Sequence, residues 1–109
     1  MAALESVLKI LWSRDALTDL DEAYEFIAKE NPSAARGIIE RIETLLESLS
    51  VHPKLGRVGR VKGTRELVVT GTPFILPYAI DKRGILILGV RHGAKKMANA
   101  RHWKGVIAQ

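Results

Sequence analysis

Two stretches in the first half of the chain carry apolar residues at the spacing of an amphipathic helix. Asn31-Pro32 separates them, because proline disfavours helical geometry in the residue before it but fits the first turn of the next helix. Ser13 precedes the first helix as a candidate N-cap. The short connection predicts an antiparallel helix hairpin. The first stripe comprises Leu17, Leu20, Tyr24, Ile27 and Ala28, and the second comprises Ala35, Ile38, Ile39, Ile42, Leu45, Leu46 and Leu49.

Short apolar runs around this hairpin predict β-strands. One run, 7–12, precedes the helices, and three runs, 66–70, 74–80 and 85–92, follow them. The run 85–92 is apolar on both faces, so we expect it to be the central strand. Pro77 cannot donate a ladder hydrogen bond and therefore indicates a bulge or a locally unpaired edge. Residues 94–108 return to helical spacing.

The order of these elements predicts one α+β domain that spans residues 1–109. We expect an N-terminal strand, an antiparallel two-helix hairpin packed on a twisted antiparallel β-sheet, and a C-terminal helix. No apolar run approaches the roughly 18 residues that a membrane span needs, and the first residues lack a basic leader. We therefore expect a soluble cytoplasmic protein. The absence of cysteine excludes disulfides and a thiol nucleophile.

Charge divides the chain into two unlike halves. The net charge is +5, but residues 1–50 hold five Lys/Arg and ten Asp/Glu, whereas residues 51–109 hold twelve Lys/Arg and two acids. Within 54–65 there are five basic residues, three glycines and no acid. Such a loop is typical either of a solvated surface or of a site for an anionic partner. The residues predicted to bind that partner are Arg57, Arg60, Lys62, Arg65, Arg91 and Lys95.

The basic residues also suggest a possible chemistry, the metal-independent cleavage of RNA. Arg65 and Arg91 would have to reach one concavity and stabilise phosphate charge with Lys62, while His92 or Glu66 moved protons. Each proton-transfer candidate has a structural alternative, namely a partly buried histidine and an ion-pair partner of a neighbouring arginine. The histidines are scattered and no nucleotide fingerprint is present, so we expect neither a metal site nor a cofactor.

A series of short motifs resembles the RelE/ParE superfamily of toxins from type II toxin–antitoxin modules, over roughly residues 8–104. The first half contributes Trp12-Ser13, Ala16-Leu17-x-Asp19-Leu20, Tyr24-x-x-Ile27-Ala28 and Asn31-Pro32-x-Ala34-Ala35. The more specific motifs are His52-Pro53-x-x-Gly56-Arg57-x-Gly59-Arg60-Val61, Gly63-Thr64-Arg65-Glu66-Leu67, Pro73-Phe74-Ile75-x-x-Tyr78 and Val90-x-His92-Gly93-Ala94. Their order and spacing carry the resemblance.

The resemblance implies a growth-inhibiting toxin held in a complex by an antitoxin, whose binding segment would cover the helix hairpin and the sheet edge. RelE-like members cleave mRNA on the ribosome, and ParE-like members inhibit DNA gyrase without being nucleases. Arg65 and Arg91 are the counterparts of the RelE-like sheet arginines, with Lys62 in support. The C-terminal tyrosine of nuclease members is absent, and His92 would have to replace it. We therefore favour gyrase as the target.

Two other interpretations stay open at this stage. The first is a ribosome-dependent mRNA endonuclease, and the second is a non-toxic nucleic-acid or protein binding module with the same fold. Arg57 and Arg60 can also be interpreted in two ways: they fix their loop by ion pairs to the acidic helices, or they receive carboxylates of the antitoxin.

Overall fold

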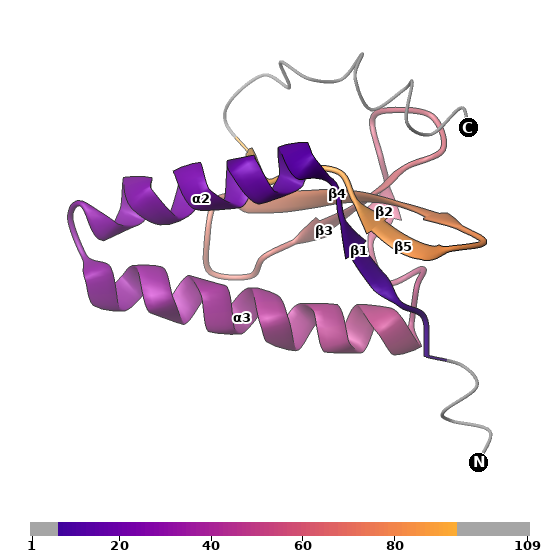
Figure 1. Cartoon of the computed structure of the whole chain (residues 1–109), viewed down its shortest axis with the longest axis horizontal. Helices are drawn as coiled ribbons and strands as arrows, with labels where there is room; N and C mark the ends of the chain where they lie inside the picture. The colour runs from indigo at the N-terminus through magenta and orange to yellow at the C-terminus, as the bar shows by residue number, and fades with distance from the viewer. Residues whose placement is uncertain (1–6, 94–109) are drawn as a thin grey trace.

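The computed structural model describes residues 7–93, which form two helices and six short strands (Figure 1). In chain order the elements are β1 (Ile10–Trp12), α2 (Arg14–Ala28), α3 (Pro32–Val51), β2 (Arg57–Val58), β3 (Arg65–Val68), β4 (Phe74–Asp81), β5 (Gly84–Ile87) and β6 (Arg91–His92). The helix predicted over 94–108 and the binding residue Lys95 lie outside the described residues. No helix within 7–93 is long and apolar enough to cross a bilayer.

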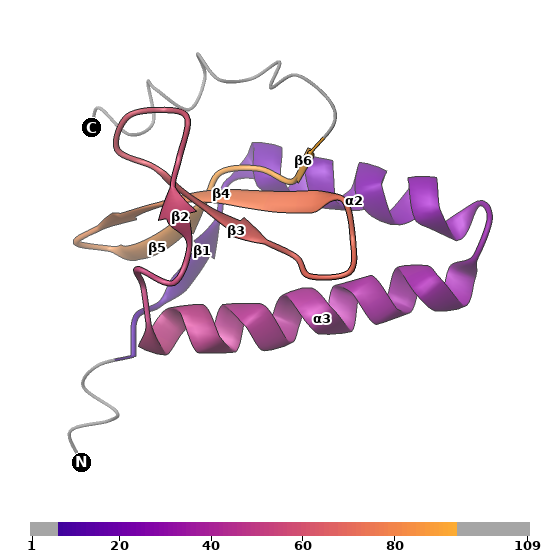
Figure 2. The ribbon, with the colours of Figure 1, turned by 180° about the vertical axis from the view of Figure 1, so that it is seen from behind.

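The helix hairpin forms where the sequence predicts it. The Ser13 hydroxyl accepts the Ala16 N–H at 3.0 Å, and the Asn31 side chain accepts the Ala34 N–H at 3.1 Å, so both helices begin at side-chain caps. The helices run antiparallel and cover one face of the sheet (Figures 1 and 2).

The sheet is mixed rather than purely antiparallel, which corrects the prediction. Its order is β1-β5-β4-β3-β2, and β1 pairs with β5 in parallel through Ile10↔Ile85 and Trp12↔Ile87. Strand β1 is also shorter than the predicted strand 7–12. The Leu8 N–H donates instead to Ser50 at the end of α3, 2.9 Å away. β5 runs in the same direction as β1, so β1 forms a parallel edge of the sheet.

The central strand is β4, and not the apolar run 85–92 as predicted. That run divides into β5 and β6, and both parts pair with β4 (Figure 2). The division falls beside Pro77, where the Leu88 N–H donates to the Pro77 carbonyl at 2.9 Å. The predicted local loss of pairing at this proline is therefore confirmed. The run is apolar because Ile85 and Ile87 lie fully buried on the helix side of the sheet.

The hydrophobic core lies between the helices and the sheet. Alternation along the strands sends Leu67, Leu76 and Tyr78 towards the helices and leaves Glu66 and Pro77 on the other face. This alternation decides which side chains of the basic segment can meet. The buried core comprises Ala16, Ile42, Leu46, Leu49, Leu67, Val69, Phe74, Leu76, Tyr78, Ile85 and Ile87.

Candidate partner-binding surface

The segment 53–56, where the basic loop begins, is anchored to the core by one hydroxyl. Tyr78 is fully buried in β4; its Oη accepts the Gly56 N–H at 2.9 Å and donates to the Pro53 carbonyl at 2.8 Å. Burial raises the pKa of the Tyr78 phenol, so the hydroxyl stays protonated and able to donate. A Cβ on Gly56 would lie 2.7 Å from the Glu66 carbonyl oxygen. The hydrophobic pattern does not predict this anchor, although Tyr78 belongs to the motif Pro73-Phe74-Ile75-x-x-Tyr78.

The rest of the loop is held by its own backbone. The Gly59 N–H donates to the Thr64 carbonyl at 2.8 Å, and the Thr64 hydroxyl donates to the Val61 carbonyl at 2.6 Å. Val61 and Thr64 are buried, whereas Arg60 and Lys62 are exposed. The loop is therefore a folded platform that presents two of the predicted basic residues to solvent.

A buried carboxylate, that of Glu66, organises the arginines of this region. Glu66 is 2 % exposed, and its Oε1 accepts from Arg57 at 3.2 Å and from Arg91 at 2.9 Å. Its Oε2 accepts the backbone N–H of Arg60 at 3.1 Å. Glu66 is therefore an ion-pair partner, which was one of its two interpretations. Arg57 pairs with the neighbouring strand and not with the acidic helices, so the predicted loop-to-helix ion pair is wrong for Arg57.

Arg91 is buried in the sheet and uses only part of its donor capacity. Its Nη2 bonds Glu66, while Nε and Nη1 are buried without a partner among residues 7–93. Burial lowers the pKa of the Arg91 guanidinium; the Glu66 carboxylate opposes this in part, and the charges of Arg60 and Arg57 lower the pKa further. Asp19 of α2 accepts the N–H of Val90 at 3.1 Å and so fixes the backbone next to Arg91. The sequence analysis did not foresee this contact.

Arg65 and Arg91 lie on opposite faces of the sheet, so the predicted common concavity does not form. Arg91 opposes Ile75 and shares the face of Glu66, whereas Arg65 opposes Tyr78 on the helix side. The Arg65 guanidinium donates to the Gly56 carbonyl at 2.7 Å and to the Lys54 carbonyl at 3.4 Å. Arg65 thus stabilises the backbone of the loop.

His92 lies on the helix-side face of the sheet, as Arg65 does, but the two side chains are far apart. The partner of His92 on β4 is Phe74 and that of Arg65 is Tyr78, four residues apart, which corresponds to roughly 13 Å along a strand. The half-buried His92 ring packs edge-on against Phe74 with centroids 5.8 Å apart. Arg65, Arg91 and His92 are thus not brought together. Residues 7–93 contain no group of three or more His, Asp or Glu side chains suited to a metal.

Comparison with known proteins places this geometry in a family. A family model described as "ParE toxin of type II toxin-antitoxin system, parDE" matches residues 10–97. The chain belongs to the ParE toxin family. It is 44 % identical over 84 residues to the putative toxin Y4kP of Sinorhizobium fredii, covering 77 % of this chain and 86 % of that protein. It is also 31 % identical over 87 residues to the toxin RelE2 of Caulobacter vibrioides, covering 80 % and 97 %.

Solved structures agree with this assignment. The chromosomal ParDE toxin–antitoxin system of P. aeruginosa superposes with a TM-score of 0.71 at 26 % identity, covering 80 % of this chain and 97 % of that one. The YoeB–YefM complex of Staphylococcus aureus shares the fold, with a TM-score of 0.51 at 20 % identity and coverage of 77 % and 94 %. The chain is thus a toxin of a type II toxin–antitoxin module, in the RelE/ParE superfamily.

Two hollows with mixed apolar and polar linings flank α3 of this ParE-family toxin. One, of about 590 Å³, opens between β1 and α3 and is lined by Val7, Leu8, Ile10, Trp12, Glu43, Leu46, Glu47 and Ser50. The other, of about 290 Å³, lies between α3 and the outer edge of β3 and is lined by Leu45, Leu55, Gly56, Arg57, Glu66, Leu67, Val68 and Thr70. The second hollow shares Arg57 and Glu66 with the Glu66 cluster, which consists of Glu66, Arg57 and Arg91.

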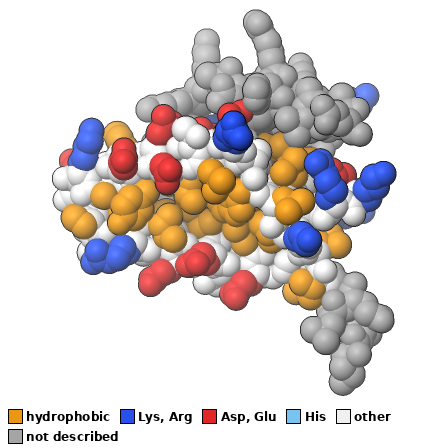
Figure 3. Space-filling view, viewed as in Figure 1, with side chains coloured by type: hydrophobic (Ala, Val, Ile, Leu, Met, Phe, Trp, Pro, Cys, Tyr) orange, Lys and Arg blue, Asp and Glu red, His pale blue; other side chains and the backbone are white. Residues whose placement is uncertain are grey.

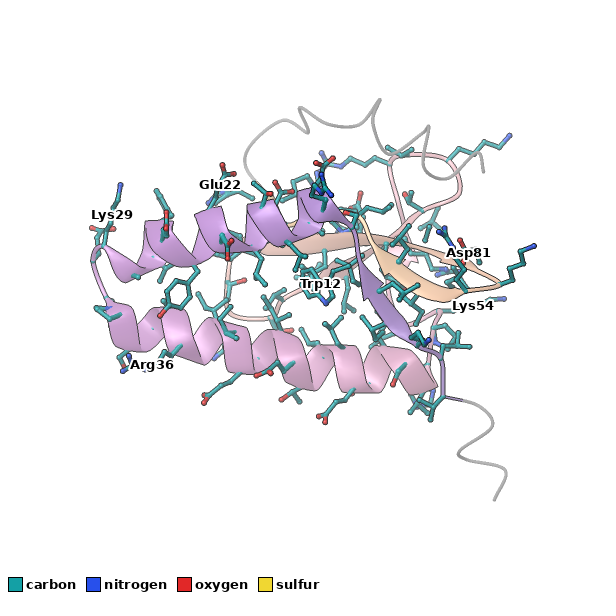
Figure 4. The ribbon with its side chains drawn as sticks, in the orientation of Figure 1. Trp12, Glu22, Lys29, Arg36, Lys54 and Asp81 are labelled. Carbon is teal, nitrogen blue, oxygen red and sulfur yellow. The ribbon has the colours of Figure 1, made fainter. Side chains whose placement is uncertain are left out.

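The surface of the toxin separates its charges. Acidic side chains line both helices on the face in Figure 3, with an apolar band between them, and basic side chains gather at one end of the molecule. Lys54 and Asp81 lie at that end, opposite the end of the hairpin where Lys29 closes α2 and Arg36 lies on α3 (Figure 4). The basic end is where the loop 54–65 and the β4–β5 turn meet solvent.

Proposed function

We propose that this toxin arrests growth by ParE-like inhibition of DNA gyrase and that it does not cleave RNA. The observation that carries the proposal is the placement of Arg65 and Arg91 on opposite faces of the sheet, each bonded to protein groups. The family-model match to ParE points to the same branch.

The chemistry of RNA cleavage explains why this placement matters. Charge stabilisation on a phosphate requires donors that are already aimed at the oxygens which gain charge. Arg65 donates to loop carbonyls, Arg91 bonds a buried carboxylate, and His92 lies beside Phe74. Gathering these groups around one phosphate would require breaking several contacts of the sheet and the loop. A toxin that acts by binding another protein has no such requirement.

We further propose a cognate antitoxin that covers α3 and the two hollows beside it. Both hollows contain apolar side chains beside polar ones, which suits a segment that folds on binding, because such segments bury apolar side chains in grooves. The similarity to the ParDE toxin–antitoxin system supports such a partner.

Pulse-labelling after induction of the toxin alone separates the candidate targets. Radioactive thymidine and methionine are supplied at short intervals, and early loss of DNA synthesis with continued protein synthesis is the expected result. Purified toxin should also inhibit supercoiling by gyrase. Co-expression of the antitoxin encoded beside the toxin should restore growth.

Two results would overturn parts of this proposal. Early loss of protein synthesis together with cleaved messages would assign the toxin to the nuclease branch. In that case Arg91→Ala should abolish cleavage. Normal growth during verified expression of folded protein would instead leave a non-toxic binding module.

A further inference from the structure

The Glu66 cluster carries more positive charge than its carboxylate can neutralise. One buried carboxylate faces the guanidinium groups of Arg57 and Arg91, and Arg60 also acts on Arg91 electrostatically. The Arg57 side chain is 56 % exposed, so water can solvate it. Water cannot solvate the Arg91 guanidinium in the same way, because only 4 % of its side chain is exposed. The excess charge is therefore concentrated on a group that water barely reaches.

The donors of Arg91 show the same imbalance. A guanidinium carries five N–H groups, and buried donors are almost always paired because an unmade hydrogen bond costs free energy. Glu66 bonds only Nη2 of Arg91, and its other hydrogen bonds come from Arg57 and from the Arg60 N–H. Nε and Nη1 remain without partners among residues 7–93. The buried Arg91 guanidinium thus lacks one anionic acceptor.

We propose that Arg91 receives one carboxylate side chain of the antitoxin; this inference rests on the proposed antitoxin partnership. A carboxylate suits the site because it is a small, singly charged group at the end of a thin side chain and bonds guanidinium in the plane. A phosphodiester is bulky on both sides and fits poorly against a guanidinium buried in a sheet.

The hollow beside β3 provides the route to this site. Glu66 and Arg57 belong both to its lining and to the cluster. The hollow also includes Val68, an exposed apolar side chain on the face of β3 that bears Glu66. Val68 pairs with Ile75 of β4, and Ile75 pairs with Arg91 on its other side, so Arg91 lies across β4 from this hollow. An antitoxin segment that continues from the hollow over the Val68 face of the sheet therefore brings an Asp or Glu towards Arg91.

A double-mutant cycle with the antitoxin encoded beside the toxin tests this inference. Each Asp and Glu of the antitoxin is changed singly to Asn or Gln, and affinity is measured against wild-type toxin, Arg91→Lys and Arg83→Lys. Arg91→Lys keeps a positive charge near Glu66 but loses the fork of donors. Arg83→Lys is the matched control, because Arg83 pairs with Asp81 in an exposed turn.

We expect one acidic position whose amide variant binds wild-type toxin about tenfold or more weakly, on the scale of a charge-assisted contact. The same antitoxin variant should bind Arg91→Lys toxin almost as well as wild-type antitoxin does. With Arg83→Lys toxin it should lose as much affinity as it loses with wild-type toxin. If Arg91→Lys does not fold, the Nε–H resonance of Arg91 in wild-type toxin gives the second measurement. That resonance should shift on antitoxin binding and stay unshifted with one amide variant.

Three results would overturn the inference. In the first, no acidic position of the antitoxin couples to Arg91. In the second, Arg91→Lys leaves antitoxin affinity unchanged but weakens binding of a short oligoribonucleotide, which would assign the site to phosphate. In both cases the antitoxin still binds, so the proposed partnership stands. If wild-type toxin fails to bind the antitoxin at all, the partnership itself fails.

Discussion

At the scale of single residues, the start of the basic loop is anchored by a side chain that carries no charge. The Tyr78 hydroxyl ties two backbone groups of segment 53–56 to the centre of the sheet. Through that segment it also fixes the Gly56 carbonyl, which Arg65 uses as an acceptor. A neutral side chain in the core thus positions a basic one at the surface.

Replacing Tyr78 by Phe should destabilise the toxin by about 1–3 kcal/mol, the cost of leaving buried polar groups unpaired. The ring stays in place, so packing is preserved while the Gly56 N–H and the Pro53 carbonyl lose their partner. Urea unfolding followed by circular dichroism measures the change. Tyr24→Phe, at a half-buried position on α2, is the control and should have a much smaller effect. Equal effects of the two variants would contradict the anchoring role.

Asp19 makes stability depend on pH in the opposite sense to a paired carboxylate. Burial raises the pKa of its carboxyl, as do Glu22 and Asp15, and the hydrogen bond from Val90 offsets this only in part. The folded state therefore binds the proton more tightly than the unfolded state, and this contribution to stability falls as pH rises through the raised pKa.

An Asn at this position keeps an acceptor for the Val90 N–H and has no charge to desolvate. Asp19→Asn should therefore gain stability relative to wild type as pH rises from about 4 to about 7. Unfolding free energies of both proteins across this range provide the measurement. A difference between the two proteins that does not change with pH would show that Asp19 titrates as it does in the unfolded chain.

At the scale of elements, the β4–β5 turn depends on a glycine at its junction with β1. Gly84 has φ +133°, and a Cβ there would meet the Lys9 carbonyl oxygen, which accepts the Ile85 N–H. A Cβ on Gly37 in α3 would meet nothing within 4 Å beyond the helix backbone around it. The two glycines therefore predict opposite responses to the same substitution.

Gly84→Ala should destabilise the toxin by more than about 1 kcal/mol, because it combines strain with a clash at the β1–β5 pair. Gly37→Ala should stabilise it by roughly 0.5–1 kcal/mol, because alanine favours the helix and restricts the unfolded chain. Thermal unfolding of both variants and of wild type shows whether each substitution raises or lowers the stability of the toxin. A stable Gly84→Ala protein would mean that β1 is not held as described.

Sequence patterns predicted those elements whose contacts are local. The helix hairpin followed from periodicity, from the cap at Ser13 and from the break at Asn31-Pro32. The interruption of strand pairing followed from Pro77. The parallel docking of β1, the central place of β4 and the split of 85–92 depend on distant partners and could not be inferred from periodicity. In the candidate site, too, local contacts could be predicted and distant ones could not. The interpretation of Glu66 as an ion-pair partner needed only neighbouring arginines, whereas the opposite faces of Arg65 and Arg91 required the strand register.

At the scale of the whole molecule, the separation of charge should steer an acidic partner towards the basic end. Lys62 is exposed on the loop, while Lys29 is exposed at the far helix connection, as Figure 4 shows for Lys29. Lys62→Glu and Lys29→Glu change the net charge equally. Any difference between them therefore reports position rather than total charge.

Lys62→Glu should slow association with the antitoxin severalfold at low salt, and Lys29→Glu should slow it less. The difference should disappear near 1 M salt, where the screening length falls to about 3 Å. Stopped-flow association rates at several salt concentrations test this. Identical rates for the two variants at low salt would exclude steering by the loop.

The parallel pairing of β1 with β5 also determines how late in its synthesis the toxin can complete its fold. Ser13 and Leu88, which meet where the two strands end, are 75 positions apart in the chain. Contacts of such separation close late during folding. Ile10→Ala in β1 should therefore speed unfolding and leave the folding rate nearly unchanged, whereas Ile42→Ala in α3 should slow folding. During synthesis, the toxin would stay incomplete and therefore harmless until β5 has emerged from the ribosome, which gives a newly made antitoxin time to meet it.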